Sequence, residues 1–558
     1  MKSSYIRILL LGTLAITFFV LTNRWREIFP ETLKTIKNEQ KSSSFLNTRN
    51  TEKKNDRNVN DLAANERTQN FKKISPASVI INTKVFKNLI ISQHNGAFTK
   101  ACLLAHHISL KDHHPMPLLS NDSGHKYIAQ SVIEIDGKTE NIIFQHHNTV
   151  TKEDHTVVTI IAHINNLVIT KNYIFDNHNY AVDISQKVEN KSIYPVSISF
   201  NHQIIRQVNL KNNSFSLFDA HSYSFKGIGI SSVNKPFQKT AFSDLESMPI
   251  KVSTTLGWSA MIEQYFVSLW IPNNKGIAFT TYAQKIAKDI YQTGVITLPV
   301  VVSSGNTLIN NSIFYTGPII TKNLEDIVVH FGQNAPKGLD QLVDYGLLSF
   351  ISVIIFWLME VIYSWVNNWG LAIILVTICI KLLFYPLSAK SYKSMAKMRM
   401  LQPRMKKLQE LYKDDRQKLG RKMMDLYKHE KANPASGCLP ILIQIPVFIA
   451  LYWVLLESVQ LRQAPFIFWI NDLASKDPYF VLPVLMGISM FFQQKVSPTS
   501  ADPTQARIMM LMPLIFTVFF ASFPSGLVLY WLTNNIISIF QQWYITKKYT
   551  IFHQTKRV

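Results

Sequence analysis

The chain has 558 residues, too many for a single domain, and 47% of them are hydrophobic. The apolar residues gather at the N-terminus and after about residue 345, with a polar middle between them. This distribution argues against a purely soluble protein and predicts membrane segments that flank a soluble domain. The formal net charge of +22 suits nucleic acid or anionic lipid as a partner. Lysine, asparagine and isoleucine are frequent throughout, so the local distribution of charge is more informative than its total.

The reactive residues predict no catalytic or metal site. Of the three cysteines, only Cys102 lies in the polar middle, so no disulfide framework is expected there. The histidines are scattered, and adjacent pairs such as His106 and His107 would point to opposite faces of a strand. No phosphate-binding loop, dinucleotide-binding fingerprint or nucleophile elbow is present. We therefore expect no cofactor, no resident metal and no catalytic residue, and we predict that the chain is not an enzyme.

The N-terminal segment 1–29 predicts a membrane anchor. Its apolar run 8–21 is short enough for a signal peptide, but no small-x-small cleavage site follows it. Tyr5 and Trp25 suit the two membrane interfaces, so residues 5–21 are predicted to span without being cleaved. The following residues, 30–75, are rich in polar and charged residues and predict a disordered linker.

Residues 76–340 predict a large antiparallel β-sandwich. The stretch "TVVTIIAHINNLVITKNYIF" combines β-branched runs with a turn candidate at Asn165 and Asn166. In "YAVDIS", Val182 and Ile184 would share one face of a strand, and similar short runs recur between turn residues. Nothing in this region indicates catalysis, and the aromatic-rich segment 257–272 is expected to lie in the core.

Six apolar candidates follow, and charge orients them. The candidates are residues 347–365, 369–387, 438–456, 479–492, 508–523 and 527–543. The segment 388–432 carries 14 Lys and Arg against 5 Asp and Glu, which predicts a cytoplasmic loop. The basic tail 546–558 is predicted to be cytoplasmic too. Several candidates are short, so we expect them to thin the bilayer locally or to leave polar surface within it.

A parity constraint then limits the number of spans. With the N-terminus inside and the β domain outside, an odd number of crossings must connect the β domain to the cytoplasmic loop. The first candidate carries Glu360 and almost adjoins the second. We therefore expect segment 341–366 to be an interfacial helix on the outer surface. The prediction is a polytopic α-helical membrane protein of six spans with both termini in the cytoplasm.

Lys381 lies inside the second apolar candidate, in "TICIKLLFYP". A lysine in this position either snorkels to the headgroups or marks a pathway through the membrane. The proposed spans offer it no acidic partner, which favours a wet cavity over a buried ion pair. Polar residues at helical spacing would share that cavity, or would only form hydrogen bonds between helices. The candidate groove and substrate-contact residues are Lys381, Thr377, Gln444, Ser489, Asn534 and Ser538.

The cytoplasmic loop predicts two basic helices, separated by Asp414 and Asp415, which offer an N-cap for the second. Methionine-rich faces adapt to varied apolar partners, which predicts a docking surface on Met395, Met398, Met405 and Met423. The alternative is a hairpin packed on itself beneath the membrane. Its charge suits anionic lipid or ribosomal RNA, without any specific nucleic-acid sequence.

Several long motifs resemble the YidC family of membrane protein insertases. They are "YPLSAKSYKSMAKMRMLQP", "NPASGCLPILIQIPVFIALYWVL", "LRQAPFIFWINDLASKDPYFVLPVLMGISMFFQQKVSP" and "FPSGLVLYWLTNN". The resemblance is dense over about 340–545, and the anchor and β domain match the Gram-negative form. It implies a five-span insertase core over 367–545, whose helices surround a hydrophilic groove with one positive residue. Lys381 occupies that position, where most relatives have arginine, so a bidentate role is in doubt.

The resemblance also implies a function and partners. It implies an inner-membrane insertase and chaperone with a periplasmic β-supersandwich, acting on nascent membrane proteins from the ribosome, alone or with the Sec translocon, within the phospholipid bilayer. Two other classes differ in what they predict. A transporter predicts internal repeats and midplane ion ligands, which we do not find. A membrane-tethered binding domain leaves the polar stripes and short spans without a role.

Overall fold

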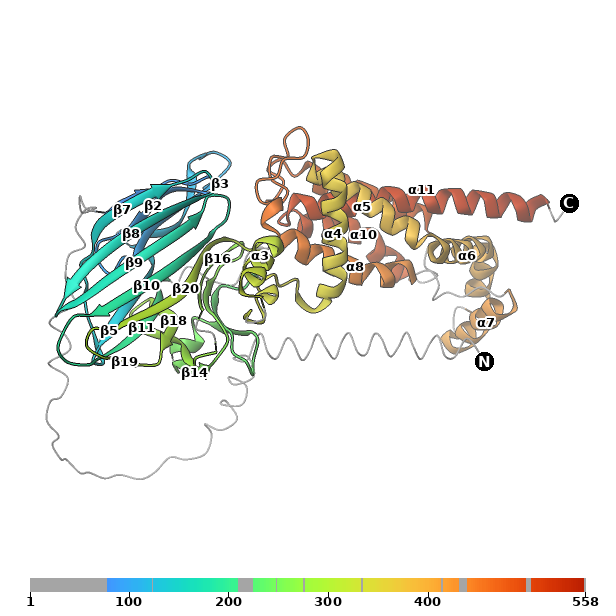
Figure 1. Cartoon of the computed structure of the whole chain (residues 1–558). Helices are drawn as coiled ribbons and strands as arrows, with labels where there is room; N and C mark the ends of the chain where they lie inside the picture. The colour runs from blue at the N-terminus through green and yellow to red at the C-terminus, as the bar shows by residue number, and fades with distance from the viewer. Residues whose placement is uncertain are drawn as a thin grey trace, which may run out of the picture. The chain divides into compact units, whose positions relative to one another are not determined.

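The computed structural model describes residues 78–555, apart from 123, 209–223, 247, 274–275, 333–334, 413–414, 431–438 and 498–502. The predicted anchor 1–29 and linker 30–75 lie outside the described residues. The described part has an antiparallel β domain followed by a helical region (Figure 1).

Two antiparallel sheets build the β domain. The first has eleven strands: β1 (Val79–Ile81), β2 (Phe86–Ile91), β3 (Phe98–His107), β4 (Pro115–Asp122), β5 (His125–Ile135), β11 (Val196–Gln207), β18 (Ile290–Thr297), β17 (Phe279–Ala287) and β14 (Ile250–Thr254) in spatial order, with β6 (Lys138–Thr139) and β19 (Val300–Val302) beside β5 and β11. The second has nine: β13 (Gln238–Ala241), β12 (Gly227–Ile230), β15 (Ser259–Ile262), β16 (Phe266–Pro272), β20 (Thr307–Pro318), β10 (Ala181–Asn190), β9 (Leu167–Asp176), β8 (His155–Ile164) and β7 (Gln145–Thr151).

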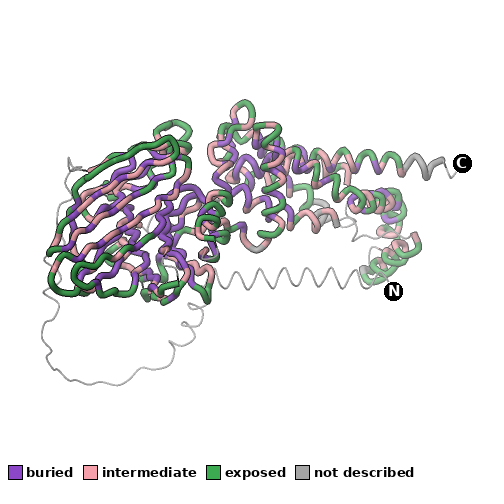
Figure 2. Tube along the Cα trace, viewed as in Figure 1, coloured by how far each residue is buried: buried purple, intermediate pink, exposed green. Residues whose placement is uncertain are grey.

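Local sequence accounts for much of this domain. Asn165 and Asn166 both have positive φ, at 46° and 61°, and they join β8 to β9 in the two-residue turn that the sequence predicts. Burial alternates along β8, β9 and β10 (Figure 2). The side chains of Val182 and Ile184 are therefore buried in the core, while those of their neighbours on β10 are only partly buried. Residues 257–272 are core, as expected, because Trp258 and Trp270 are almost fully buried.

One polar layer crosses this apolar core. In the second sheet, Lys171, Gln186 and Asn310 are cross-strand neighbours on β9, β10 and β20. In the first sheet, Ser131 and His202 pair on β5 and β11. All five side chains are buried, and bonds from Lys171 to the Ser131 backbone and from Gln186 to the Ser131 hydroxyl join the two rows. Such a layer favours one alignment of the two sheets, because any other alignment leaves buried polar groups unpaired.

The helical region follows α3 (Thr321–Phe331), which packs on the β domain through Leu324 and Ile327. Its helices are α4 (Ser349–Val366), α5 (Trp369–Leu383), α6 (Tyr385–Leu411), α7 (Arg416–His429), α8 (Leu439–Glu457), α9 (Val481–Val496), α10 (Pro503–Phe520) and α11 (Ser525–Thr555). Side chains of α4, α5, α8, α9, α10 and α11 share one hydrophobic core.

These helices begin where the sequence places a cap or a proline. The Asn368 side chain accepts from the Leu371 amide at the start of α5, and the Asp415 side chain accepts from the Lys418 amide at the start of α7. Pro386 lies in the first turn of α6, where a missing N–H costs nothing. The chain bends by 69° between α5 and α6, so the apolar run predicted to extend to residue 387 ends as a straight helix at Leu383.

Few of the described helices are both long enough and apolar enough to cross a membrane. Among the described residues, α4 is long and apolar enough to cross a membrane, and the bent pair α5–α6 passes the same test as one span. The apolar parts of α8, α9 and α10 are shorter, at Leu442–Glu457, Val481–Val496 and Ile508–Phe520. Figure 1 shows α4 running crosswise to the long helix α11, although the two belong to the same hydrophobic core.

Candidate functional site

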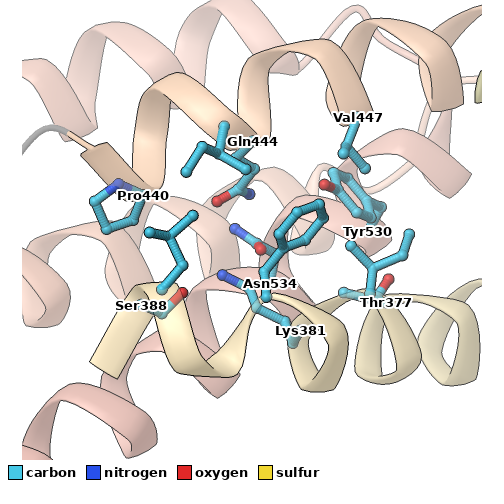
Figure 3. Close-up of a pocket in the computed structure, with 12 residues that line it drawn as sticks. Thr377, Lys381, Ser388, Pro440, Gln444, Val447, Tyr530 and Asn534 are labelled. Atoms are coloured by element: carbon cyan, nitrogen blue, oxygen red, sulfur yellow. The ribbon is translucent and has the colours of Figure 1, made fainter. Parts of the chain in front are cut away.

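A pocket lies between α5, the start of α6, α8 and α11 (Figure 3). Its polar lining comes from Thr377, Lys381, Ser388, Gln444, Tyr530 and Asn534, and its apolar lining from Ile380, Phe384, Leu387, Pro440, Ile443 and Val447. Thr377, Lys381 and Ser388 lie along one wall, and Gln444 and Tyr530 lie across from it (Figure 3). The pocket therefore combines one cation with uncharged polar groups from three sequence-distant segments.

Helical periodicity explains how these side chains come together. Thr377 precedes Lys381 by four residues on α5, so both share a face, and Tyr530 precedes Asn534 by four residues on α11. The 69° bend after α5 carries the chain across the end of the pocket, which allows Ser388 to contribute from α6. A straight continuation of α5 would have extended past the pocket instead of closing one side of it.

Lys381 is only 9% exposed and donates a 2.8 Å hydrogen bond from Nζ to the Ser538 hydroxyl. The sequences of α5, α8, α9, α10 and α11 contain a single carboxylate, Glu457, which lies at the far end of α8 from Gln444. The cation therefore has uncharged neighbours in the pocket. An anion that enters the pocket meets a positive charge that these helices leave without a counter-ion.

The six predicted groove residues have different surroundings. Thr377, Lys381, Gln444 and Asn534 line the pocket. Ser489 does not: its hydroxyl donates to the Met486 carbonyl at 2.6 Å and accepts from Asn535 at 3.0 Å, so it bonds α9 to α11. Ser538 lies behind Lys381 and is 2% exposed.

Polar side chains form two adjacent rows along α11. One row, Asn534 and Ser538, faces Lys381, and the other, Asn535 and Gln542, faces α9. Tyr530 and Tyr392 also lie near the site, and neither is among the groove residues predicted from the sequence. The four-residue spacing from Tyr530 to Asn534 was a usable signal, but Tyr392 lies beyond the bend, where the period of α5 no longer applies.

Three of the four predicted docking methionines pack inside the α6–α7 hairpin. Met405 is buried, and Met398 and Met423 lie against the small cluster that it forms with Leu401. Met395 is half-buried. This packing matches the alternative of a hairpin closed on itself, while much of α7 remains exposed (Figure 2).

No group of three or more His, Cys, Asp or Glu able to hold a metal occurs among the residues that the structure describes. The pocket combines the Lys381 ammonium with amide and hydroxyl groups and an apolar rim.

Comparison with known proteins connects both regions to one family. The family described as "60Kd inner membrane protein" matches residues 361–553, and the "YidC periplasmic domain" matches residues 78–358. These matches indicate an inner-membrane protein with a periplasmic domain.

Full-length relatives agree. "Membrane protein insertase YidC" of Francisella philomiragia subsp. philomiragia is 50% identical over 99% of this chain and 100% of the relative. The protein of the same name from Francisella tularensis subsp. novicida is 48% identical with the same coverage. A solved structure described as "Active YidC insertase crystal structure with the first transmembrane domain resolved" aligns with 84% of this chain and 92% of its own, at 20% identity and a TM-score of 0.38. The matched length and identity show that the chain belongs to the YidC family of membrane protein insertases.

Proposed function

We propose that this protein inserts and helps to fold inner-membrane proteins by drawing a hydrophilic client segment into the Lys381 pocket. The observation that carries the proposal is the pocket itself. In it a nearly buried cation, with no carboxylate partner among the described residues, lies among polar groups of α5, α8 and α11. A polar segment crossing the bilayer costs free energy because its groups lose water. Groups of the pocket replace part of that water along a shortened path.

The driving force in this proposal is the partitioning of the client's apolar helix into lipid. The acidic residues of the client's outer tail pair with Lys381 during passage, and no covalent bond is made or broken. A lysine ammonium serves this role as a point charge, without the planar fork of arginine. The positive charge therefore matters more than its hydrogen-bonding geometry.

The proposed topology has six spans: the N-terminal anchor, the α5 segment, α8, α9, α10 and α11. Both termini and the α6–α7 hairpin lie in the cytoplasm, and the β domain lies in the periplasm. In this topology α4 lies in the outer interface, and two observations support that position. It runs crosswise to α11 (Figure 1), and it exposes Trp357 and Trp365, which suit the headgroup level.

The proposed partners are nascent chains delivered by ribosomes, the Sec translocon and the lipid bilayer. Docking of a client on Met398, Met405 and Met423 requires the α6–α7 hairpin to open, because these residues pack against one another. Met400 and Met424 are exposed and offer an apolar contact without opening.

Complementation of an insertase-depleted bacterium tests the proposal, with insertion of a single-span reporter bearing an acidic outer tail measured by protease protection. Lys381→Arg should insert the reporter as the wild type does. In Lys381→Ala and Lys381→Glu, insertion of the reporter should fall about tenfold or more, because the free energy of a hydrogen bond to a charged group corresponds to a factor of that size. Lys495→Ala is the matched control, because Lys495 lies over the Phe491 ring near the end of α9 and outside the pocket. If Lys381→Ala inserts the reporter as the wild type does, the pocket cation has no part in insertion.

A further inference from the structure

Ser538 is the direct hydrogen-bond partner of Lys381, and it does not line the pocket. Its hydroxyl lies 2.8 Å from Lys381 Nζ, and its side chain is 2% exposed. The residues around the pocket include Asn534, one turn earlier on α11, but not Ser538. Ser538 therefore lies behind the cation, on the side away from an entering client.

The hydrogen-bonding capacity of Ser538 points to a supporting role. A hydroxyl has one proton to donate, and Ser538 donates it to the Asn534 carbonyl at 2.7 Å. Toward Lys381 it can therefore only accept. The Tyr392 hydroxyl of α6 interacts with the same side chain. Contacts with α11 and α6 thus hold the oxygen that accepts the hydrogen bond from Lys381, and Ser538 has no donor left for a client.

Lysine needs such a support because its stem is long and flexible. A lysine near the end of an apolar helix extends its ammonium toward water or headgroups when nothing holds it back. Lys381 is the third residue from the end of α5, so its side chain is long enough to extend toward the headgroups in this way. One bond to Ser538 still leaves two of the three ammonium protons for the pocket.

We propose that Ser538 is a positioning residue that holds the Lys381 ammonium beside the pocket and thereby sets the preference of the protein for clients with acidic outer segments. This inference rests on the proposed function. The ammonium is already positioned when a client carboxylate enters, and it binds the carboxylate while keeping its hydrogen bond to Ser538. A client with a neutral outer segment makes no use of the charge, so its insertion does not depend on Ser538.

The test compares two single-span reporters in the full-length protein, one with an acidic and one with a neutral outer tail. Ser538→Ala should slow insertion of the acidic reporter by about threefold, the factor of an average side-chain hydrogen bond between membrane helices, and leave the neutral reporter unchanged. Ser538→Thr keeps the hydroxyl and should restore insertion. Ser489→Ala is the matched control, because it removes a buried hydroxyl that bonds to Asn535 and not to Lys381.

A second readout follows the position of the ammonium itself. Labelling of Lys381 by a water-soluble amine reagent, measured by peptide mass spectrometry across a pH series, should be faster in Ser538→Ala than in the wild type or in Ser489→Ala. Equal losses for both reporters with unchanged labelling would mean that Ser538 only supports the fold, and the inference would be wrong. Normal insertion of both reporters by Ser538→Ala would also overturn it. The Lys381→Ala variant separates failure of this inference from failure of the proposed function. If the proposed function is wrong, Lys381→Ala inserts the acidic reporter normally.

Discussion

We predict that the buried Lys171 of β9 makes the stability of the β domain depend on pH. Its side chain is 1% exposed, Nζ donates to the backbone carbonyls of Asn95 at 2.8 Å and Ser131 at 2.5 Å, and it lies 4.8 Å from the centre of the Phe144 ring. Burial without a carboxylate partner penalises the charged amine and lowers the pKa of Lys171 from 10.5 to about 7.

The direction of the effect follows from proton binding. Between pH 7 and pH 10 the unfolded chain holds a proton on Lys171 that the folded domain has released, so the free energy of unfolding increases as the pH increases. Lowering the pKa from 10.5 to about 7 corresponds to roughly 5 kcal/mol in total. About 2 kcal/mol of this should develop between pH 7 and pH 9. Above about pH 10 stability should fall again, because burial raises the pKa of Tyr173 and other core tyrosines.

Hydrogen exchange of the full-length protein in detergent measures this effect, with mass spectrometry of peptides from β9 and β10 at pH 7 and pH 9. Lys171→Met should be less stable at both pH values, because two buried carbonyls lose their donor. The decisive quantity is the pH slope, which should nearly vanish in Lys171→Met and persist in Lys138→Met, a change at an exposed lysine of β6. A wild-type slope in Lys171→Met would refute this reasoning, since the titrating group would lie elsewhere.

Three further substitutions test packing and capping, each measured by thermal unfolding in detergent. Gly487→Ala should cost about 1–3 kcal/mol, because the new methyl group would collide with the Thr517 side chain where α9 meets α10. Gly420→Ala, with open space around it in α7, should instead stabilise that helix by up to about 1 kcal/mol, and a loss there would contradict the exposed position. Asp477→Ala should cost roughly 3 kcal/mol, because its carboxylate accepts three hydrogen bonds ahead of and within the first turn of α9, and an unchanged melting temperature would show that these bonds contribute little.

Local patterns in the sequence were sufficient for many elements of the fold. The Asn165–Asn166 turn and the alternating faces of β8 to β10 depend on neighbouring residues alone, and the structure has both. The apolar runs predict α4, α8 and α9 to within a few residues at most ends, because each helix interior is predominantly apolar. The bend between α5 and α6 was missed because the apolar run continues through it, and only tertiary packing decides where the axis turns.

In the candidate site, too, some features follow from local sequence and others depend on tertiary packing. Residues on one helical face, such as Thr377 and Lys381, are brought together by the period of the helix, which a sequence displays. Asn534 and Asn535 are adjacent in sequence, yet one faces Lys381 and the other faces Ser489. Which row meets which neighbour depends on the rotation of α11 within the bundle, and a single sequence does not contain that angle. The polar layer around Lys171 was missed for the same reason, because its residues come from five separate strands.

In the proposed mechanism, the free energy that drives insertion comes from the client's apolar helix, whereas the rate is limited by its polar tail. Burying a typical apolar client helix in lipid releases about 0.8 kcal/mol per CH₂ group, whereas one acidic residue at the centre of the bilayer costs about 2.5–3.5 kcal/mol on insertion scales. Insertion is then favourable overall without any input of chemical energy, and the barrier is the passage of the polar tail. A single cation that is held in place, and not paired with a carboxylate, lowers this barrier without trapping the tail in a permanent ion pair. An Asn534→Asp variant would place a carboxylate beside Lys381 in the pocket, and it should slow insertion of the acidic reporter while leaving the neutral reporter unchanged.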